Sequence, residues 1–310
     1  MNNDLTFKTL TEQYLKQDPE ELMAAHGKSF YFASMIFSKE RLTKITKLYK
    51  LCRFIDDCAD ELEKDESQLA ITSLINDLEH PQNTTQFNQL VSEVENWGVK
   101  RSYLKELIIG AQFDAHQGEI KTTRDLLLYC YRVAGVVGLM MCPLIGVKNK
   151  KAYPHAIDLG LGMQLTNICR DILEDAQMNR TYIPDSELEN ISIEVLQKQG
   201  DTPEEIKKLT AQLLEKADQY YVSAYQGLSY IPLRPRLVIM LAGEIYRHIG
   251  VKIRKNNFNV LQGRTYLTIN EKVFVSFKTL IKLGIVFFKT PKIHKKDLHT
   301  LIQDLPEAHK

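Results

Sequence analysis

The sequence predicts an all-α protein that folds as a single domain over residues 1–310. No stretch of any length alternates apolar and polar residues as a half-buried strand does, and no segment repeats at a fixed period. Apolar residues instead recur at helical spacing through most of the chain. Helix-start signals precede several of these stretches, as at Asp18-Pro19-Glu20-Glu21. The 310 residues suffice for one large helical domain.

In the first part of the chain, junctions rich in polar residues separate the expected helices. One junction is the stretch HGKSF at residues 26–30, and another is the Pro/Asn/Thr-rich stretch at residues 80–86. In chain order, helices are expected to begin at Asp18 and then to span residues 38–59, 67–78, 87–97 and 102–117. Lys28 and Ser29, in the first junction, are either phosphate donors or simply part of a polar helix junction.

The most apolar segment spans residues 133–147 and is expected to lie inside a core helix over residues 123–146. Its length of about 15 residues, interrupted by Pro143, is too short to span a membrane. Gly135 and Gly138 stand inside this helix, where glycine costs stability. They predict a close approach, either by a packed neighbouring helix or by a long hydrocarbon chain.

After residue 184, further helices are expected over residues 202–225 and 237–253, with a turn at residues 231–236 between them. The tail from 272 to 296 differs, because it carries seven Lys and no acid, interleaved with apolar residues. A basic amphipathic segment of this kind can lie on an anionic membrane. The alternative is a closing helix that packs on the body and leaves its Lys side chains in water.

The composition indicates the compartment of the protein and the kinds of partner it binds. A net charge of +1, with 25% charged residues, gives no indication of nucleic-acid binding. The five Cys are odd in number and form no CxxC pair, which predicts buried free thiols in a reducing compartment. The N-terminus shows no signal-peptide pattern, so a cytoplasmic protein is expected.

Two stretches carry the chemistry. In residues 159–184, Gln164, Asn167, Asp171 and Asp175 fall within about 80° of one another on a helical wheel, beside an apolar flank. The last three are spaced i, i+4, i+8, and such a ladder of oxygens without His suits a hard cation such as Mg²⁺.

The second stretch lies upstream, at residues 48–60. Tyr49, Arg53, Asp56, Asp57 and Asp60 occupy roughly one third of its helical wheel, and apolar residues fill most of the rest. Either acidic stripe alone could be a solvated polar face. Because both helices are largely apolar, we expect the stripes to face a shared cavity.

Opposed carboxylate clusters repel each other unless positive charge lies between them. Mg²⁺ ions that bridge the clusters to a diphosphate would neutralise this charge and activate the diphosphate as a leaving group. Ionisation of a prenyl diphosphate in a dry, apolar chamber is therefore predicted. A glycosidase pair fits less well, because each side carries a cluster rather than one carboxyl group. Arg180, which follows the second stretch, is either a diphosphate ligand or an exposed helix-end residue.

The chain resembles the squalene and phytoene synthases, which join two prenyl diphosphates head to head. The resemblance covers roughly residues 26–264 and is most similar to the bacterial phytoene synthases. It rests on HGKSF (26–30), CRFIDDCAD (52–60), YCYRVAGVVG (129–138), QLTNICRDILED (164–175), NRTYIP (179–184) and YRHIG (246–250). It implies an isoprenoid synthase fold, with helices around a central cavity between two aspartate-rich helices.

The resemblance also implies roles for individual residues. The metal ligands are expected to be Asp56, Asp57, Asp60, Asn167, Asp171 and Asp175. The diphosphate contacts are expected to be Lys28, Ser29, Arg53, Arg170 and Arg180. The reaction chamber is expected to be lined by Phe30, Tyr129, Gln164 and Tyr246, and the prenyl channel by Val133, Ala134, Val137 and Gly138. Of these, Asp56, Asp60, Asp171, Asp175, Tyr129 and Arg53 are expected to be catalytic.

Two residues depart from the family pattern. Asn179 stands where Gly is usual before Arg-x-Tyr, and Asn tolerates the left-handed backbone that such a turn needs. Ile120 stands where related sequences often carry Tyr, so the chain lacks that hydroxyl.

The activity implied by the resemblance is phytoene synthesis from two geranylgeranyl diphosphates through prephytoene diphosphate, in carotenoid biosynthesis. Mg²⁺, or Mn²⁺ in its place, is the expected cofactor. No NADPH is expected, because phytoene formation ends in proton loss. The rivals are a C30 dehydrosqualene or squalene synthase that uses farnesyl diphosphate, and a non-catalytic, membrane-associated family member. Peripheral attachment to the inner face of the membrane is a further expectation from the tail at 272–296.

Overall fold

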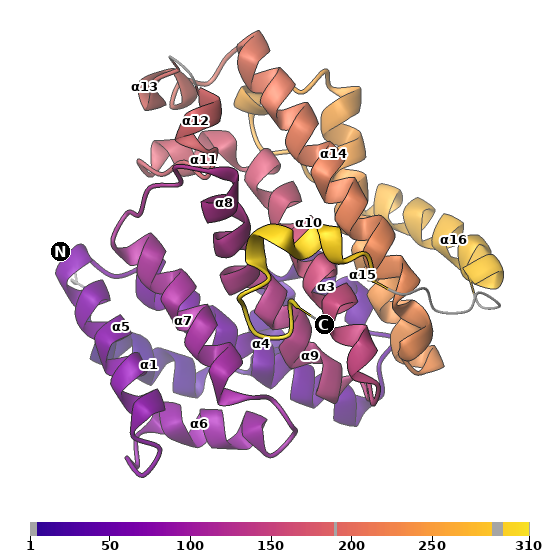
Figure 1. The fold of residues 1–310 in the computed structure, drawn as a ribbon. Helices are drawn as coiled ribbons and strands as arrows, with labels where there is room; N and C mark the ends of the chain where they lie inside the picture. Colours follow the sequence, from indigo (N-terminus) through magenta and orange to yellow (C-terminus); the bar gives the residue numbers. More distant parts are fainter. Residues whose placement is uncertain (1–4, 189–190, 287–293, 310) are drawn as a thin grey trace.

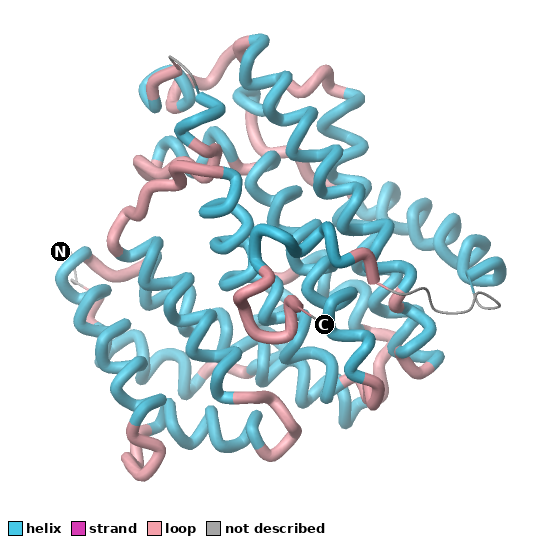
Figure 2. The backbone as a smooth tube through the Cα atoms, viewed as in Figure 1, coloured by secondary structure: helices cyan, strands magenta, loops and turns pink. Residues whose placement is uncertain are grey.

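The computed structural model describes residues 5–188, 191–286 and 294–309 (Figure 1). Helices and loops make up this part of the chain, and it contains no strand (Figure 2). The prediction of an all-α protein is confirmed.

The helices in the first part of the chain include the one that carries the N-terminal acidic stretch. They are α1 (Phe7–Lys16), α2 (Pro19–His26), α3 (Lys28–Ser34), α4 (Lys39–Asp60), α5 (Lys64–Glu79), α6 (Gln86–Glu95) and α7 (Arg101–Ala115). The predicted cap at Asp18 is confirmed, because its carboxylate accepts hydrogen bonds from the Glu20 and Glu21 amides at 2.9 and 3.0 Å. Gly27 ends α2 and separates it from α3, as the polar junction predicts.

The remaining elements build the centre and the C-terminal half. They are α8 (Thr123–Cys130), the π-helical turn η1 (Tyr131–Gly135), α9 (Val136–Leu144), α10 (Tyr153–Arg170), α11 (Ile172–Gln177), α12 (Asp185–Leu188), α13 (Ile193–Leu196), α14 (Glu204–Gln226), α15 (Leu233–Lys255) and α16 (Ile269–Val286). Short 3₁₀ turns, η2 (Lys150–Ala152), η3 (Leu228–Tyr230), η4 (Val260–Gln262) and η5 (Lys296–Ile302), join or end them.

The prediction of a turn over residues 231–236 is wrong in its second half. Helix α15 already begins at Leu233, with Pro232 before it and Pro235 inside its first turn. The amides of a first turn have no partner within the helix, so a proline there removes no hydrogen bond. The stretch that contains the second acidic ladder is also not one uninterrupted helix, because the backbone leaves helical geometry at Asp171, between α10 and α11.

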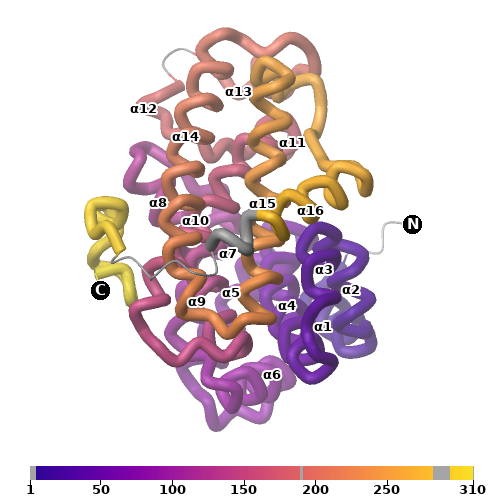
Figure 3. Tube along the Cα trace, turned by 90° about the vertical axis from the view of Figure 1, so that its right-hand side faces the viewer, coloured from indigo at the N-terminus to yellow at the C-terminus, as the bar shows by residue number. Residues whose placement is uncertain are grey.

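Helix α10 runs through the middle of the molecule and packs against α9, α14 and α15 (Figures 1 and 3). Gly138 and Gly160 make the packing of this helix on α9 and η1 possible. A Cβ on Gly138 would lie 2.2 Å from the Ala156 carbonyl oxygen, and one on Gly160 would lie 2.3 Å from that of Ala134. Of the two explanations for the helix glycines, the packed neighbour therefore holds at Gly138.

The apolar segment is a core helix. The run Thr123–Leu144 has the length and hydropathy of a membrane span, but 61% of its most apolar window is buried inside the protein. This agrees with the prediction from its sequence. All five Cys are buried and unpaired, also as predicted.

The C-terminal part of the chain packs on two different helices of the body. Helix α16 packs on α15, whereas η5 lies against α8 (Figure 3). The part of the tail at residues 287–293 lies outside the described residues.

Candidate active site

A cavity of about 930 Å³ lies between α4, α10 and the α9–η1 segment. This volume is at the upper end of the range for small-molecule sites, roughly 300–1,000 Å³. Its wall is mainly apolar, with contributions from Leu48 of α4, Met141 of α9 and Ile249 of α15. Polar side chains from α4 and α10 gather along one part of this wall, as the two predicted stripes require.

Most residues predicted to contact the substrate line this cavity. They are Lys28, Ser29, Phe30, Arg53, Val133, Ala134, Val137, Gly138, Gln164, Asn167, Arg170 and Tyr246. The π-helical turn places Val133 and Ala134 on the wall, and such turns recur at functional sites. Tyr129 and Arg180 do not line the cavity. Tyr129 contacts Asp114, and Arg180 contacts Asp60.

The first acidic cluster lies at the C-terminal end of α4. Asp56 lines the cavity and Asp60 follows one turn later. Burial raises the pKa of Asp56 to about 8, and the neighbouring Asp60 carboxylate adds to this rise. Asp57 points elsewhere, because Tyr14 donates a hydrogen bond to it and Arg53 forms an ion pair with it at 2.6 Å. The structure thus brings Asp56 and Asp60 together and gives Asp57 protein partners of its own.

The second cluster follows the end of α10. Asn167 lines the cavity, Asp171 is the residue between α10 and α11, and Asp175 lies one turn further along. Burial raises the pKa of Asp175 to about 8, and repulsion from Asp171 contributes further. The Asn167 amide donates to Gln164 at 3.2 Å, whereas its buried Oδ1 has no partner among the described residues.

Asp114 of α7 lies between the two clusters, and the sequence did not single it out as a site residue. The hydroxyls of Tyr129 and Tyr182 donate hydrogen bonds to it at 3.0 and 2.7 Å. Burial raises its pKa to about 6, against the effect of the Tyr182 hydrogen bond, and Asp60 adds to the rise. Its charge in turn raises the pKa of both Asp56 and Asp175. Asp114 therefore couples the two clusters.

Arginines neutralise part of this acidic charge. Arg180 forms an ion pair with Asp60 at 2.6 Å, so a residue beyond the second cluster reaches the first. Arg170 pairs with Asp171 at 2.5 Å. Arg264, which the sequence did not indicate as a site residue, also pairs with Asp171, at 2.9 Å, and lines the cavity. These arginines place guanidinium donors beside both clusters, where an anion with several oxygens would bind.

The residues of the two clusters fit a hard divalent cation. Burial raises the pKa of three carboxylates, Asp56, Asp114 and Asp175, and repulsion between neighbouring carboxylates adds to each rise, so a cation that binds among them would be stabilised. The unpartnered Oδ1 of Asn167 is a carbonyl-type oxygen, and no His or Cys belongs to either cluster. An all-oxygen donor set of this kind is typical of Mg²⁺ or Mn²⁺ sites.

The turn after the second cluster bears out one prediction about the backbone. Asn179, which was expected to take the left-handed conformation of this turn, adopts φ 58°, a conformation that Asn tolerates. This turn leads into Arg180 and so directs its side chain toward Asp60.

Comparisons with known proteins all lead to one family. The family model described as squalene/phytoene synthase matches residues 23–271. The 15-cis-phytoene synthase of Pantoea ananas is 32% identical over 274 residues, which cover 82% of this chain and 87% of the relative. The phytoene synthase of Rhodobacter capsulatus is 30% identical, over 89% of this chain and 84% of the relative. A dehydrosqualene synthase crystal structure superposes with a TM-score of 0.78 at 25% identity, over 90% of this chain and 99% of that one.

Proposed function

The chain belongs to the squalene/phytoene synthase family, and on that premise we propose that it condenses two geranylgeranyl diphosphates head to head to phytoene. It is an enzyme of the prenyltransferase class, and its place is in carotenoid biosynthesis. The observation that carries the proposal is one cavity whose wall holds Asp56 of the first cluster and Asn167 of the second beside a large apolar surface. The reaction passes through prephytoene diphosphate and releases diphosphate twice.

The acidic clusters would hold the metal. Asp56 and Asp60 on one side, and Asn167, Asp171 and Asp175 on the other, would bind Mg²⁺ or, in its place, Mn²⁺. When bound, these cations supply positive charge that stabilises the departing diphosphate.

The remaining polar residues bind and orient the diphosphates. Arg53, Arg170 and Lys28 line the cavity with positive charge, and Arg180 adds a guanidinium at Asp60. Guanidinium groups match phosphate oxygens with paired donors. Arg180 and Arg170 are each paired with a carboxylate of the clusters, so both are already positioned at the place where the diphosphates bind.

The apolar wall protects the cations formed from the prenyl chains. Val133, Ala134 and Val137 present only hydrocarbon to the cavity and exclude water, which would otherwise quench an allylic cation. Tyr129 and Tyr182 stack at 4.6 Å and hold Asp114 through their hydroxyls. Because formation of phytoene ends with loss of a proton, we propose that the reaction uses no NADPH.

One candidate differs only in chain length. A dehydrosqualene synthase shares this fold at 25% identity, which supports a C30 synthase using farnesyl diphosphate as the second candidate. The phytoene synthase relatives, at 30–32% identity over most of the chain, favour the C40 reaction. A non-catalytic role is not favoured, because both acidic clusters are intact.

The test is a product assay. Purified full-length protein with Mg²⁺ receives geranylgeranyl or farnesyl diphosphate separately, without NADPH, and the hydrocarbons are identified by mass. A C40 product from geranylgeranyl diphosphate is expected. A C30 product alone would transfer the function to the second candidate, and no product from either would support the non-catalytic reading.

We also propose that this enzyme is cytoplasmic and associates peripherally with the inner face of the membrane through α16. One face of this helix packs on α15 and buries Val275, but most of its apolar side chains lie on the opposite, uncovered face. Ile269, Val273, Phe274, Phe277, Leu280 and Ile281 are all more than half exposed. Lys272 and Lys278 lie among them, and residues 266, 267 and 272 line the cavity, so the exposed face adjoins the site that takes up lipophilic substrates.

Sedimentation with vesicles that contain anionic lipid tests this second proposal. The double variant Phe274→Glu, Phe277→Glu is expected to lose most of the vesicle binding, because it replaces two inserted side chains with charges. Val222→Glu, at a 49% exposed apolar residue of α14, is the matched control and is expected to bind as the wild type does. Equal binding by all three proteins would contradict the assignment to α16.

A further inference from the structure

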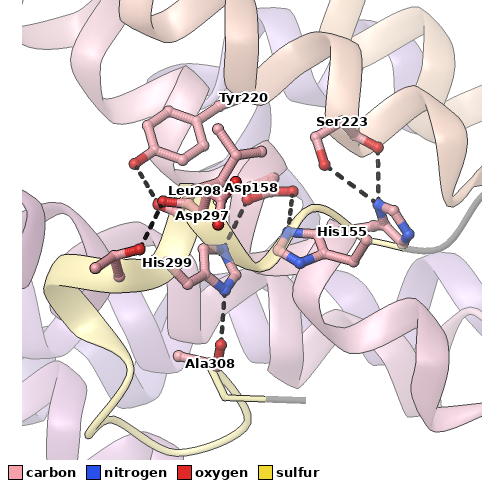
Figure 4. A network of polar contacts seen from close by, with 10 residues as sticks. His155, Asp158, Tyr220, Ser223, Asp297, Leu298, His299 and Ala308 are labelled. Carbon is pink, nitrogen blue, oxygen red and sulfur yellow. Dashed lines mark hydrogen bonds and ion pairs between the residues drawn. The ribbon is translucent and has the colours of Figure 1, made fainter.

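A separate group of side chains, one aspartate and two histidines, meets at α10 away from the acidic ladder. Asp158 is completely buried, and one of its oxygens faces His294 Nε2 at 2.9 Å. The other faces His299 Nε2 at 2.8 Å (Figure 4). The ligand atoms of the three residues all lie within 4.8 Å of one another. Both histidines are also buried and belong to the C-terminal segment, 136 and 141 residues away along the chain.

The hydrogen bonds of His299 leave one proton or one cation to be accounted for. Its Nδ1 lies 3.0 Å from the Ala308 carbonyl oxygen, which can only accept, so Nδ1 carries a hydrogen (Figure 4). In a neutral ring, Nε2 then presents a lone pair to the Asp158 carboxylate, which has no hydrogen to give. Two lone pairs 2.8 Å apart repel each other inside the protein. A hydrogen shared between the two atoms, or a metal ion in its place, removes this repulsion.

We propose that Asp158, His294 and His299 form a binding site for a borderline divalent transition-metal ion, Zn²⁺ in the first place. Two imidazole nitrogens and a carboxylate oxygen are the ligands that Zn²⁺ takes in proteins. The hydrogen bond from His299 Nδ1 to the Ala308 carbonyl is the arrangement that fixes the tautomer of metal-binding histidines and directs Nε2 at the metal.

This site is separate from the proposed magnesium site in place and in chemistry. Asp158 precedes Asn167 by nine residues, which is about 14 Å along the helix. The acidic clusters contain only oxygen donors, whereas this site contains two nitrogens. It joins the C-terminal segment to α10, the helix that carries Asn167 into the cavity wall, so a metal there fixes the end of the chain to the central helix.

The experiment is a metal titration of the untagged full-length protein after removal of metal with a chelator. Zn²⁺ is added in the presence of millimolar Mg²⁺, which occupies the oxygen-only clusters, and bound Zn²⁺ is counted by elemental analysis after gel filtration. One Zn²⁺ per chain is expected. At 100 times its Kd, Zn²⁺ is expected to raise the Tm by about 4 °C.

Three variants make the result specific. His299→Gln and His294→Gln are each expected to weaken Zn²⁺ binding by more than about tenfold, and two variants guard against one that fails to fold. His80→Gln, at an exposed histidine, is the matched control and is expected to bind one Zn²⁺ as the wild type does. Circular dichroism checks that each variant is folded.

Folded wild-type protein that retains no Zn²⁺ would overturn the proposal and leave a plain hydrogen bond between His299 and Asp158. Equal Zn²⁺ binding by His299→Gln and His80→Gln would also overturn it. The titration needs no substrate, so its outcome is independent of the product assay.

Discussion

Replacing Asp56 with Asn is expected to make the metal-free protein more stable while removing its activity. Burial and the adjacent Asp60 raise the pKa of Asp56 to about 8, whereas an unfolded aspartate titrates near 3.8. Between these values the folded state keeps the proton that the unfolded state releases, so the stability of the wild type falls as the pH rises. Asn does not titrate, so the variant does not lose stability in this way as the pH rises.

The magnitude follows from the linkage relation. Each pH unit between the two pKa values costs the wild type about 1.4 kcal/mol, so the advantage of Asp56→Asn grows by about 3 kcal/mol from pH 5 to pH 7. For a chain of 310 residues, an unfolding entropy of about 0.65 kcal/mol/K converts this into about 4–5 °C of Tm. Above about pH 8 the advantage stops growing, because Asp56 is then ionised in both states.

Thermal unfolding in EDTA at pH 5 and pH 7 measures the effect. Asp65→Asn, at an exposed aspartate of α5, is the control and should show no such growth with pH. A difference between Asp56→Asn and the wild type that is equal at both pH values, or a variant that is less stable at pH 7, would refute the account of crowded carboxylates.

Three further predictions test other parts of the structure. Arg180→Ala removes the guanidinium at Asp60 and is expected to lower kcat/KM about tenfold to a hundredfold, measured by steady-state kinetics, and an unchanged value would exclude Arg180 from diphosphate binding. Gly138→Ala is expected to destabilise the protein by about 1–3 kcal/mol in urea unfolding, because its Cβ meets a backbone carbonyl. Gly200→Ala, where no atom lies within 4 Å, should change stability by less than about 0.5 kcal/mol, and similar losses in both would contradict the packing. Val137→Phe fills part of the cavity wall and is expected to lower turnover of the C20 substrate about tenfold more than that of the C15 substrate, in parallel assays of both, with an equal loss arguing against a role in chain length.

The sequence predicted the parts of the site that depend on helical spacing. Asp56 and Asn167 line one cavity because the stripes on α4 and α10 lie on the inner faces of helices that are apolar elsewhere. The left-handed backbone at Asn179 was likewise predictable, because few residues adopt it without strain. Local spacing and local backbone preference were sufficient for these residues.

Residues that join the site through tertiary packing were not predictable in this way. Asp114 is one acid on an amphipathic helix, and only the approach of Tyr129 and Tyr182 places it between the clusters. Arg264 pairs with Asp171 across 93 residues of chain. The periodicity of α7, or the loop around residue 264, contains no information about such contacts.

The backbone also departs from the predicted helices where packing overrides local preference. The apolar stretch predicts one continuous helix, but a π-helical turn at Tyr131–Gly135 divides it. Likewise, the ladder that ends in Asp175 predicts one helix, but the backbone breaks at Asp171. An apolar pattern at helical spacing does not distinguish an α-turn from a π-turn, so these departures required the structure.

The turnover of Asp171→Ala at saturating Mg²⁺ tests the central claim most directly, because Asp171 belongs to the second cluster and not to the apolar wall. If the clusters provide the charge that allows diphosphate to leave, release of diphosphate from geranylgeranyl diphosphate should fall about 100-fold to 1,000-fold relative to the wild type. Asp65→Ala should release it at the wild-type rate. Full turnover by folded Asp171→Ala would contradict the account.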